Sequence, residues 1–400
     1  MRTSFEPQPI VDVARELGLP EDLVEPYGRG KAKIDLAALQ RPPSGKGRLI
    51  LVSAINPTPA GEGKTTTSVG LGMGMRRLGK RVALALREPS LGPVFGVKGG
   101  GTGGGKASLV PADDINLHFT GDIHAITTAH NLLSAMIDNA CHFRSKLGEK
   151  GEIDARSISW GRAMDMNERA LRNVIVGLGR KVDGVPRQDR FDITAASEVM
   201  AIVALASGPE DLEARLSRIV IGSNTDGAAL TAGDVGAAGA MTAVLRDALK
   251  PNLVQTAEGG PAIVHAGPFG NIAHGCNSIL ATRLALAHSD YTITEAGFGF
   301  DLGGEKFFDL VAKGGDLSPA AVVIIASLRA LRLHGGVAPA KVSEPDLAAV
   351  QAGLPNLIRH LENARHFGRP VVIALNAFTG DSDEETAAVR AAVEDRKSVV

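Results

Sequence analysis

The chain has 400 residues, 44% of them hydrophobic, and this length exceeds one ordinary hydrophobic core, so we expect two or more lobes. Its 43 Lys and Arg nearly balance its 44 Asp and Glu, and the net charge of −1 excludes a global field that would attract nucleic acid or an anionic membrane. The two cysteines, Cys141 and Cys276, are too few for a disulfide framework, and the longest apolar run, at 320–326, is far below a membrane span of about 20 residues. We therefore expect a cytoplasmic protein with no nucleic-acid partner and no membrane segment.

The first part of the chain predicts a strand and a helix joined by a glycine-bearing loop. Residues 11–17 have the pattern of a short leading helix, and a Pro/Gly-rich connector at 40–47 leads to an apolar run of strand length at 48–55. Residues 65–78 place small and apolar residues at helical spacing. The order strand, turn and helix is typical of a loop that binds phosphate groups.

That loop predicts a nucleotide-binding site. Gly61 and Gly63 let backbone N–H groups turn toward an anion, and Lys64 can reach the terminal phosphates. Thr65 or Thr66 would then offer a hydroxyl to magnesium. The usual pattern GxxxxGK[ST] has Gly where this chain has Thr58, and the alternative is a Gly-rich turn with an exposed lysine. That alternative leaves the three threonines at the helix start unexplained.

A second apolar run at 81–86 ends in Arg87, Glu88 and a proline that stops the strand. Because ligands sit at the carboxyl ends of strands in an open parallel sheet, we expect Arg87 and Glu88 beside the phosphate loop, although they are also compatible with ordinary strand-end charges. The Gly-rich segment at 92–106 follows, with Lys98 and Lys106 at its flanks. A flexible linker rarely has such cations, so we favour a second anion-contacting loop.

The middle of the chain has the pattern of an inserted lobe. Residues 121–143 predict a helix whose polar stripe, His124, Thr128, Asn131 and Asp138, faces either a cleft or solvent. Residues 145–260 are helical and polar and show no chemistry by spacing. Strand-like runs return at the end of the chain, each followed by polar or Gly-rich residues, at 262–266, 291–294, 322–326 and 371–375. His265, His274 and Cys276 lack the paired spacing of a zinc site.

Taken together, these motifs resemble the formate–tetrahydrofolate ligase family, also called formyltetrahydrofolate synthetase, over nearly the whole chain. Thr58 is that family's own version of the phosphate loop. The chain departs from the family pattern at Lys106, Ser327 and Ala377, where Tyr, Thr and Lys are common. The motifs that carry the resemblance lie at 58–66, 87–93, 97–105, 114–122, 124–139, 269–277, 294–308 and 329–336.

The resemblance implies a ligase that depends on ATP and Mg²⁺, and it adds a monovalent cation as a further expected cofactor. Formate attacks the γ-phosphate to give formyl phosphate, and N10 of tetrahydrofolate then attacks its carbonyl, so that 10-formyltetrahydrofolate, ADP and phosphate form. Lys64 and Arg87 are the implied catalytic cations, Thr65 the implied metal contact, and Phe378 the aromatic that stacks on the pterin ring. The implied ATP-binding residues are Thr58, Pro59, Ala60, Gly61, Glu62, Gly63, Lys64, Thr65 and Thr66. The implied substrate-binding residues are Arg87, Glu88, Lys98, Gly99, Asp122 and Phe378.

The expected fold is α/β, with a P-loop NTPase-like, mostly parallel sheet flanked by helices and an inserted helix-rich lobe. We expect a nucleotide-binding core at 1–120, the lobe at 121–285, a return to the core with folate-side loops at 286–380, and the start of a further region at 381–400. Members of the family continue past the position matching Val400, so we expect a C-terminal truncation and a final segment, 395–400, of foreign origin. The resemblance also implies a homotetramer.

Two other classes of protein share the phosphate loop. One is a P-loop ligase or kinase that acts on a different small carboxylate, and the other is a partitioning or assembly ATPase. The Gly-rich segment and the Arg87–Glu88 pair favour chemistry on a second anion. The pattern assigns no role to His124, His130, His265 or His274.

Overall fold

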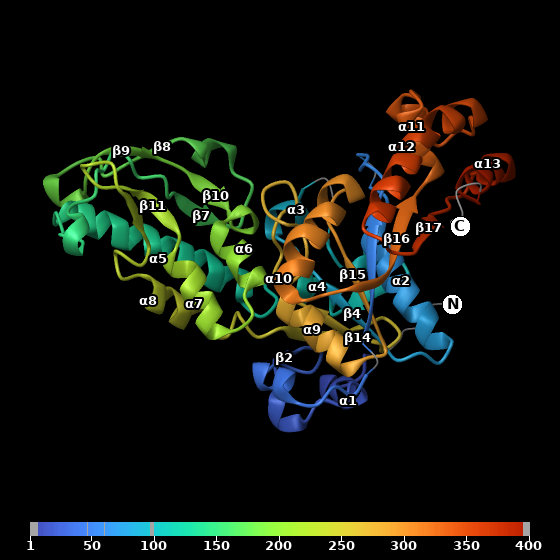
Figure 1. Ribbon diagram of the computed structural model, residues 1–400, viewed down its shortest axis with the longest axis horizontal. Helices are drawn as coiled ribbons and strands as arrows, with labels where there is room; N and C mark the ends of the chain where they lie inside the picture. The colour runs from blue at the N-terminus through green and yellow to red at the C-terminus, as the bar shows by residue number, and fades with distance from the viewer. Residues whose placement is uncertain (1–6, 46, 60, 97–99, 395–400) are drawn as a thin grey trace.

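A sheet of eleven strands forms the centre of the computed structural model, which describes residues 7–45, 47–59, 61–96 and 100–394. Six neighbouring strands are parallel (Figure 1). In spatial order they are β14 (Pro261–Val264), β4 (Val82–Leu86), β15 (Tyr291–Glu295), β3 (Arg48–Ala54), β16 (Pro319–Ala326) and β17 (Val371–Leu375). Antiparallel strands extend the sheet beyond β14: β13 (Asn252–Thr256), β2 (Ala32–Ile34), β1 (Val24–Pro26), β6 (Ala107–Val110) and β5 (Gly103–Gly104).

The parallel strands are apolar on both faces because helices cover both faces. Alternate residues of β3 enter different clusters: Leu51 packs with α12 (Leu347–His366), whereas Val52 packs with α2 (Lys64–Arg77). On the side of Leu51 lie α1 (Ile10–Glu16), α9 (Ile279–His288), α11 (Leu328–His334) and α13 (Asp383–Glu394). Short helices α3 (Leu91–Val94), α4 (Ala112–Asn116) and α10 (Lys313–Gly315) complete the core, and two π-helical turns cover Phe300–Gly304 and Phe307–Ala312.

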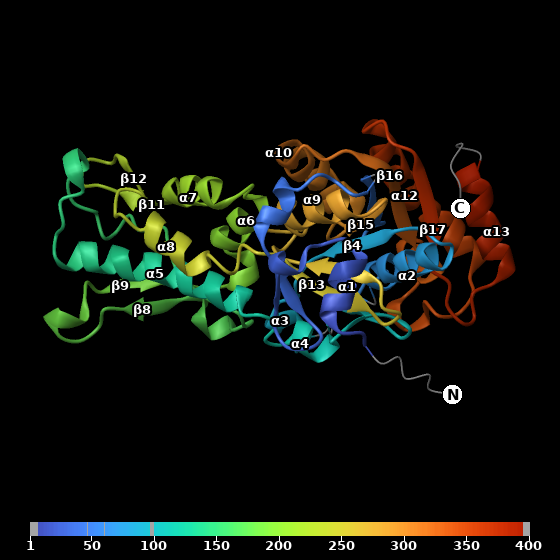
Figure 2. The same ribbon diagram turned by 90° about the horizontal axis from the view of Figure 1, so that it is seen from below.

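A second lobe lies beside the sheet in both ribbon views (Figures 1 and 2). It has its own hydrophobic core, which includes Ile126, Leu133, Val203 and Met241. Its helices are α5 (Asp122–His142), α6 (Glu198–Leu205), α7 (Pro209–Ser217) and α8 (Ala238–Leu245). Its paired strands are β7 (Arg162–Met164) with β10 (Phe191–Ile193), β8 (Val174–Val176) with β9 (Arg187–Asp189), and β11 (Val220–Ser223) with β12 (Ala229–Thr231).

The polar stripe of α5 divides between two environments. Asn131 bonds both the N–H and the carbonyl of Ala163 on β7, and Asp138 forms an ion pair of 2.5 Å with Arg187 on β9. His124 and Thr128 are exposed. The inner half of the stripe therefore holds the helix to the lobe's own strands.

The α/β class with a mostly parallel sheet is confirmed, as are the leading helix and the strands expected near 48, 81, 262, 291, 322 and 371. The antiparallel extension was not expected: β13 pairs with β14, with β2 and with β6. The expected division of the chain into four ranges stays a prediction. Among the described residues, no helix is both long and apolar enough to cross a membrane.

Candidate active site

The loop between β3 and α2 is closed by one of its own carboxylates. The backbone N–H of Thr58 donates to Glu62 Oε1 at 2.8 Å, and Asn376 Nδ2, just after β17, donates to the Glu62 carbonyl at 3.1 Å. Gly61 and Gly63 have φ of 74° and 75°, which glycine adopts without strain. A Cβ on Gly63 would lie 2.6 Å from Asn376 Nδ2. The left-handed conformation therefore favours glycine at 63, and a larger residue there would also displace the Asn376 side chain.

An acidic residue lies directly behind the start of α2. Lys64 and Thr65 are the first two residues of that helix, and the Thr65 hydroxyl lies 3.0 and 3.2 Å from the two carboxylate oxygens of Glu295. Ser68, one turn later, is 3.5 Å from Glu295 Oε2. Glu295 is buried at the carboxyl end of β15, the neighbour of β3. A hydroxyl and a carboxylate at this position are oxygen ligands of the kind that Mg²⁺ takes.

The sequence reasoning gave Glu295 no role. The available signal was an acidic residue at the carboxyl end of a buried strand. It became informative only once the sheet order placed β15 next to β3.

Arg87 lies at the carboxyl end of β4, on the other side of β15. Its Nη1 donates to the Pro268 carbonyl at 3.3 Å, and its Nε is buried with no hydrogen-bond partner among the described residues. A Cβ on Gly297 would lie 3.2 and 3.4 Å from the two Nη atoms, so the absence of a side chain there leaves room for the guanidinium. Burial, followed by the charges of Arg87 and Lys306, lowers the pKa of His274 to about 4. The guanidinium therefore has a neutral imidazole near it and spare hydrogen-bonding capacity.

Glu88 and Asp122 are both buried, in different states. The Glu88 Oε2 atom has no partner among the described residues, and burial, followed by the charge of Asp122, raises the pKa of Glu88 well above its usual range. The Asp122 carboxylate accepts from Lys33 Nζ at 2.7 Å and from Asn252 Nδ2 at 2.7 Å. Asp122 therefore holds the start of α5 to β2 and β13, whereas Glu88 favours the neutral acid. Their assignment to substrate binding stays a prediction.

Phe378 follows β17 in a loop that charged residues hold in place. The guanidinium of Arg329 lies 4.2 Å from the centre of its ring, within cation–π range. The Phe378 N–H donates to Asp381 Oδ2 at 2.8 Å, and Asp381 Oδ1 accepts from Arg332 Nη2 at 3.3 Å. Arg332 is fully buried and donates to both oxygens of Glu385, at 2.8 and 2.6 Å.

These groups lie at the carboxyl ends of five consecutive strands. In order along the sheet edge they are Arg87 after β4, Glu295 on β15, the phosphate loop after β3, Arg329 after β16 and Phe378 after β17. This is the edge at which open α/β sheets bind ligands. Ala60, Lys98 and Gly99 of the predicted site lie outside the described residues.

Two other buried histidines have structural partners. His265 Nδ1 lies 2.6 Å from Ser278 Oγ, and its Nε2 lies 2.7 Å from a backbone carbonyl. His130 stacks on Trp160 with ring centres 4.2 Å apart. Burial lowers the pKa of each of these two histidines to about 4. No group of three or more His, Cys, Asp or Glu side chains within the described ranges could hold a metal ion.

Comparison with known proteins gives one consistent result. The sequence model of the family "Formate–tetrahydrofolate ligase" matches residues 1–400. A formate–tetrahydrofolate ligase from Myxococcus xanthus is 60% identical over 382 residues, which are 96% of this chain and 69% of that protein. Proteins of the same name from Paracoccus denitrificans and Maricaulis maris are 58% and 56% identical, over 95% and 97% of this chain and 68% and 69% of their own lengths.

Proposed function

The chain belongs to the formate–tetrahydrofolate ligase family, and from this premise we propose that it ligates formate to tetrahydrofolate at the expense of ATP, through formyl phosphate. A formate oxygen bonds to the γ-phosphorus as the bond to ADP breaks. N10 of tetrahydrofolate then bonds to the formyl carbon, phosphate leaves, and N10 loses its proton. The products are 10-formyltetrahydrofolate, which is a one-carbon donor, together with ADP and phosphate. The observation that carries the proposal is the phosphate loop with, two strands away, the Arg87 guanidinium, whose buried Nε has no hydrogen-bond partner among the described residues.

The nucleotide occupies the loop at 58–66 in a P-loop NTPase-like manner. Backbone N–H groups of the glycine-bearing turn and the N-terminus of α2 face the phosphates, and Lys64 adds a positive charge at the first helical position. Two hydrogen bonds restrain the described residues of this loop: Glu62 Oε1 accepts from the Thr58 N–H, and the Glu62 carbonyl accepts from Asn376 Nδ2. A preformed anion site loses less free energy on ordering when ATP binds.

Thr65 and Glu295 would hold a magnesium ion that accompanies ATP, because a hydroxyl and a carboxylate are oxygen ligands of the kind that Mg²⁺ takes. Bound there, Mg²⁺ neutralises charge on the transferring phosphoryl group. The Glu295 carboxylate fixes the direction of the Thr65 hydroxyl by accepting a hydrogen bond from it. A monovalent cation is a further expectation from the family.

Arg87 binds formyl phosphate and Phe378 stacks on the pterin ring. A guanidinium suits an anion with several oxygens because its planar fork can donate two parallel hydrogen bonds, and Arg87 has a buried Nε without a partner. A neutral Glu88 carboxyl beside Arg87 along the chain adds a hydrogen-bond donor without repelling the anion. Asp122, Lys98 and Gly99 complete the proposed substrate contacts.

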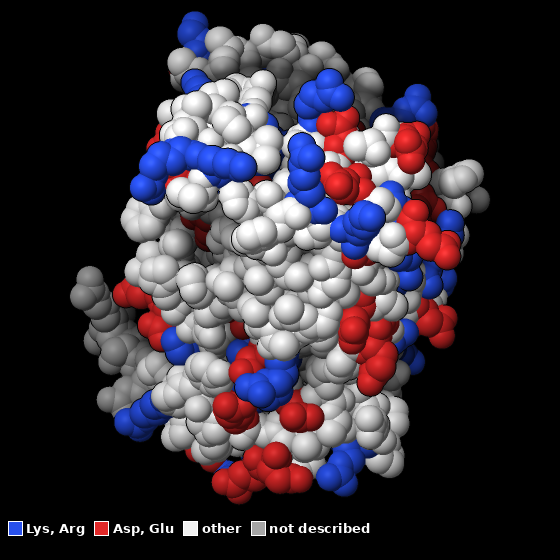
Figure 3. All heavy atoms as spheres, turned by 90° about the vertical axis from the view of Figure 1, so that its left-hand side faces the viewer, with Lys and Arg blue, Asp and Glu red and all other residues white. Residues whose placement is uncertain are grey.

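The proposed assembly is a homo-oligomer, a homotetramer by family, in the cytoplasm. The exposed apolar side chains of Ile175, Leu178 and Val182, on and beside the β8–β9 hairpin, support an association surface on the second lobe. The molecular face at that end has a broad area without charged side chains (Figure 3). We also propose the four-part division of the chain at 120, 285 and 380.

The test is product analysis with purified chain, MgATP, formate and tetrahydrofolate. The proposal expects 10-formyltetrahydrofolate and ADP in equal amounts, each dependent on all three substrates. Lys64→Ala should reduce the rate at least about tenfold to a thousandfold, the cost of one electrostatic group at a transferring phosphoryl. The matched control is Lys341→Ala, an exposed lysine far from the loop along the chain. A rate of ATP hydrolysis that does not depend on formate or tetrahydrofolate would favour an assembly ATPase. Turnover with a different carboxylate but not with formate would favour a different ligase or kinase.

A further inference from the structure

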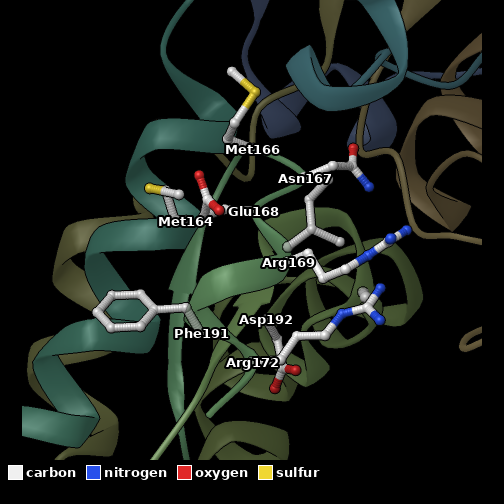
Figure 4. Close-up of a pocket in the computed structure, with 10 residues that line it drawn as sticks. Met164, Met166, Asn167, Glu168, Arg169, Arg172, Phe191 and Asp192 are labelled. Carbon is white, nitrogen blue, oxygen red and sulfur yellow. The ribbon is translucent and has the colours of Figure 1, made fainter. Parts of the chain in front are cut away.

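A cavity of about 410 Å³ opens in the second lobe, where β7 and β10 end (Figure 4). Its volume is in the range of small-molecule sites. Met164, Phe191 and Ile193 give it an apolar wall, and Arg169 and Arg172 give it a cationic one. An amphipathic cavity of this kind suits a ligand with a flat apolar part and an anionic part.

The two arginines point the same way because of the local helix. Residues 169 and 172 begin and end a 3₁₀ helix, in which side chains three positions apart eclipse each other. Figure 4 shows both side chains extending in the same direction from this turn. The sequence shows that the two arginines are three positions apart, but a single 3₁₀ turn is too short to give a periodic pattern from which the helix could be predicted.

Both guanidiniums lack an acidic partner. Among the described residues, no carboxylate lies within ion-pair distance of Arg169 or Arg172. The two acids that line the cavity are engaged elsewhere: Glu168 caps the 3₁₀ helix by accepting from the Ala170 N–H at 3.1 Å, and Asp192 pairs with Arg190 at 3.1 Å. Two like charges that project together without a counter-charge favour an anion between them.

The cavity adjoins the segments that hold Arg87. Asp165, between two lining residues, accepts from the Ser90 hydroxyl at 2.5 Å and from the Leu91 N–H at 3.0 Å, directly downstream of Arg87. On the other side, the carbonyl of Ala195, next to lining residue Ala196, accepts from the Phe269 N–H at 2.9 Å. The residue before Phe269 is Pro268, whose carbonyl accepts from Arg87.

We propose that this cavity binds the p-aminobenzoylglutamate tail of tetrahydrofolate, with the benzoyl ring against the apolar wall and the glutamate carboxylates at Arg169 and Arg172. The inference rests on the proposed function. N10 joins the pterin side of the substrate to the benzoyl ring, so the two rings leave the reacting atom in opposite directions. Phe378, at the β17 end of the sheet edge, takes the pterin, and the lobe lies beyond Arg87 at the β14 end. The tail must then leave toward the lobe.

The direct test is calorimetric titration of the 400-residue chain with p-aminobenzoyl-L-glutamate and with its γ-linked triglutamate. The triglutamate should bind more tightly, and its affinity should fall as salt rises because the contacts are ionic. Arg169→Ala plus Arg172→Ala should weaken it by at least about tenfold, the scale on which a single charged hydrogen bond changes a dissociation constant. Arg218→Ala, an exposed arginine of the same lobe without an ion pair among the described residues, should leave it unchanged.

The outcomes separate the tail site from the proposed reaction. Arginine-dependent binding of the tail probe supports the site even if the chain forms no product, in which case only the proposed function fails. Product formation with a KM for tetrahydrofolate that the double variant does not change overturns the site and leaves the function standing. Absence of probe binding to the unmodified chain, or equal loss in the Arg218→Ala control, also overturns it. Far-UV circular dichroism and the thermal midpoint of each variant should match the unmodified chain, since both altered side chains are exposed.

Discussion

Replacing Glu295 with glutamine should separate the binding of MgATP from the binding of ATP alone. The amide keeps the size of the side chain and an oxygen that can accept from the Thr65 hydroxyl, 3.0 Å away, but removes the negative charge. Loss of a partner that orients a metal ligand typically costs about 10- to 100-fold in metal affinity, or roughly 1.4–2.7 kcal/mol. The affinity for MgATP should fall by that factor. The affinity for ATP in excess EDTA should stay the same or rise, because one repelling carboxylate is gone.

Competition with a fluorescent ATP analogue measures both affinities on the same sample. Asp309→Asn is the matched control, because it removes an exposed carboxylate whose ion-pair partner is Lys313, one helical turn away. The unfolding midpoint in urea should change little in either variant. Equal weakening of MgATP and metal-free ATP by Glu295→Gln, or no change in either, would refute the reasoning that this carboxylate serves the metal.

Three further predictions concern the loop, the anion site and the folate-side loop. Arg87→Lys should lower turnover at saturating ATP at least about tenfold while leaving the ATP dissociation constant within about twofold, because lysine keeps the charge but not the fork; a raised dissociation constant with unchanged turnover would make Arg87 a nucleotide ligand. Gly63→Ala should weaken MgATP binding and destabilise the chain by about 1–2 kcal/mol, since it forces a left-handed residue and a contact with Asn376, and an unchanged urea midpoint would contradict this. Glu385→Gln should lower the free energy of unfolding, and this decrease should become smaller on acidification. Arg332 lowers the pKa of Glu385 from 4.5 to about 2. The charged carboxylate therefore stabilises the fold fully above pH 4.5, and that stabilisation disappears as the pH falls toward 2. Urea midpoints at pH 7, 4.5 and 3 measure it, and a difference that does not vary with pH would contradict the linkage.

The parts of the fold that sequence reasoning predicted are those with local signals. The strand before the phosphate loop is a run of apolar residues, buried because helices cover both faces of a parallel sheet, and the loop itself has turn chemistry that favours glycine at 63. Arg87 was placed correctly at a strand end because proline terminates the strand two residues later. Each of these inferences uses fewer than about 20 consecutive residues.

The remaining features depend on contacts between distant segments. Glu295 and Thr65 are hydrogen-bonded although they are 230 positions apart, and β13 pairs with β2, which lies more than 200 positions earlier in the chain. Neither contact can be predicted from the pattern of neighbouring residues. The unpaired arginines of the second lobe are similar, because an arginine without an acidic neighbour in space looks the same in sequence as a paired one. Asp122 shows the same dependence: its two buried partners, on β2 and β13, are distant in the sequence, and its assignment to substrate binding stays a prediction.

The most direct test of the proposed reaction follows an oxygen atom. If formate attacks the γ-phosphate and phosphate later leaves the formyl carbon, one oxygen of formate labelled with ¹⁸O must end in inorganic phosphate. Mass spectrometry of the phosphate released from MgATP, labelled formate and tetrahydrofolate should therefore show one ¹⁸O per product molecule formed. Phosphate without the label, alongside labelled 10-formyltetrahydrofolate, would contradict a formyl phosphate intermediate and with it the roles given to Lys64 and Arg87.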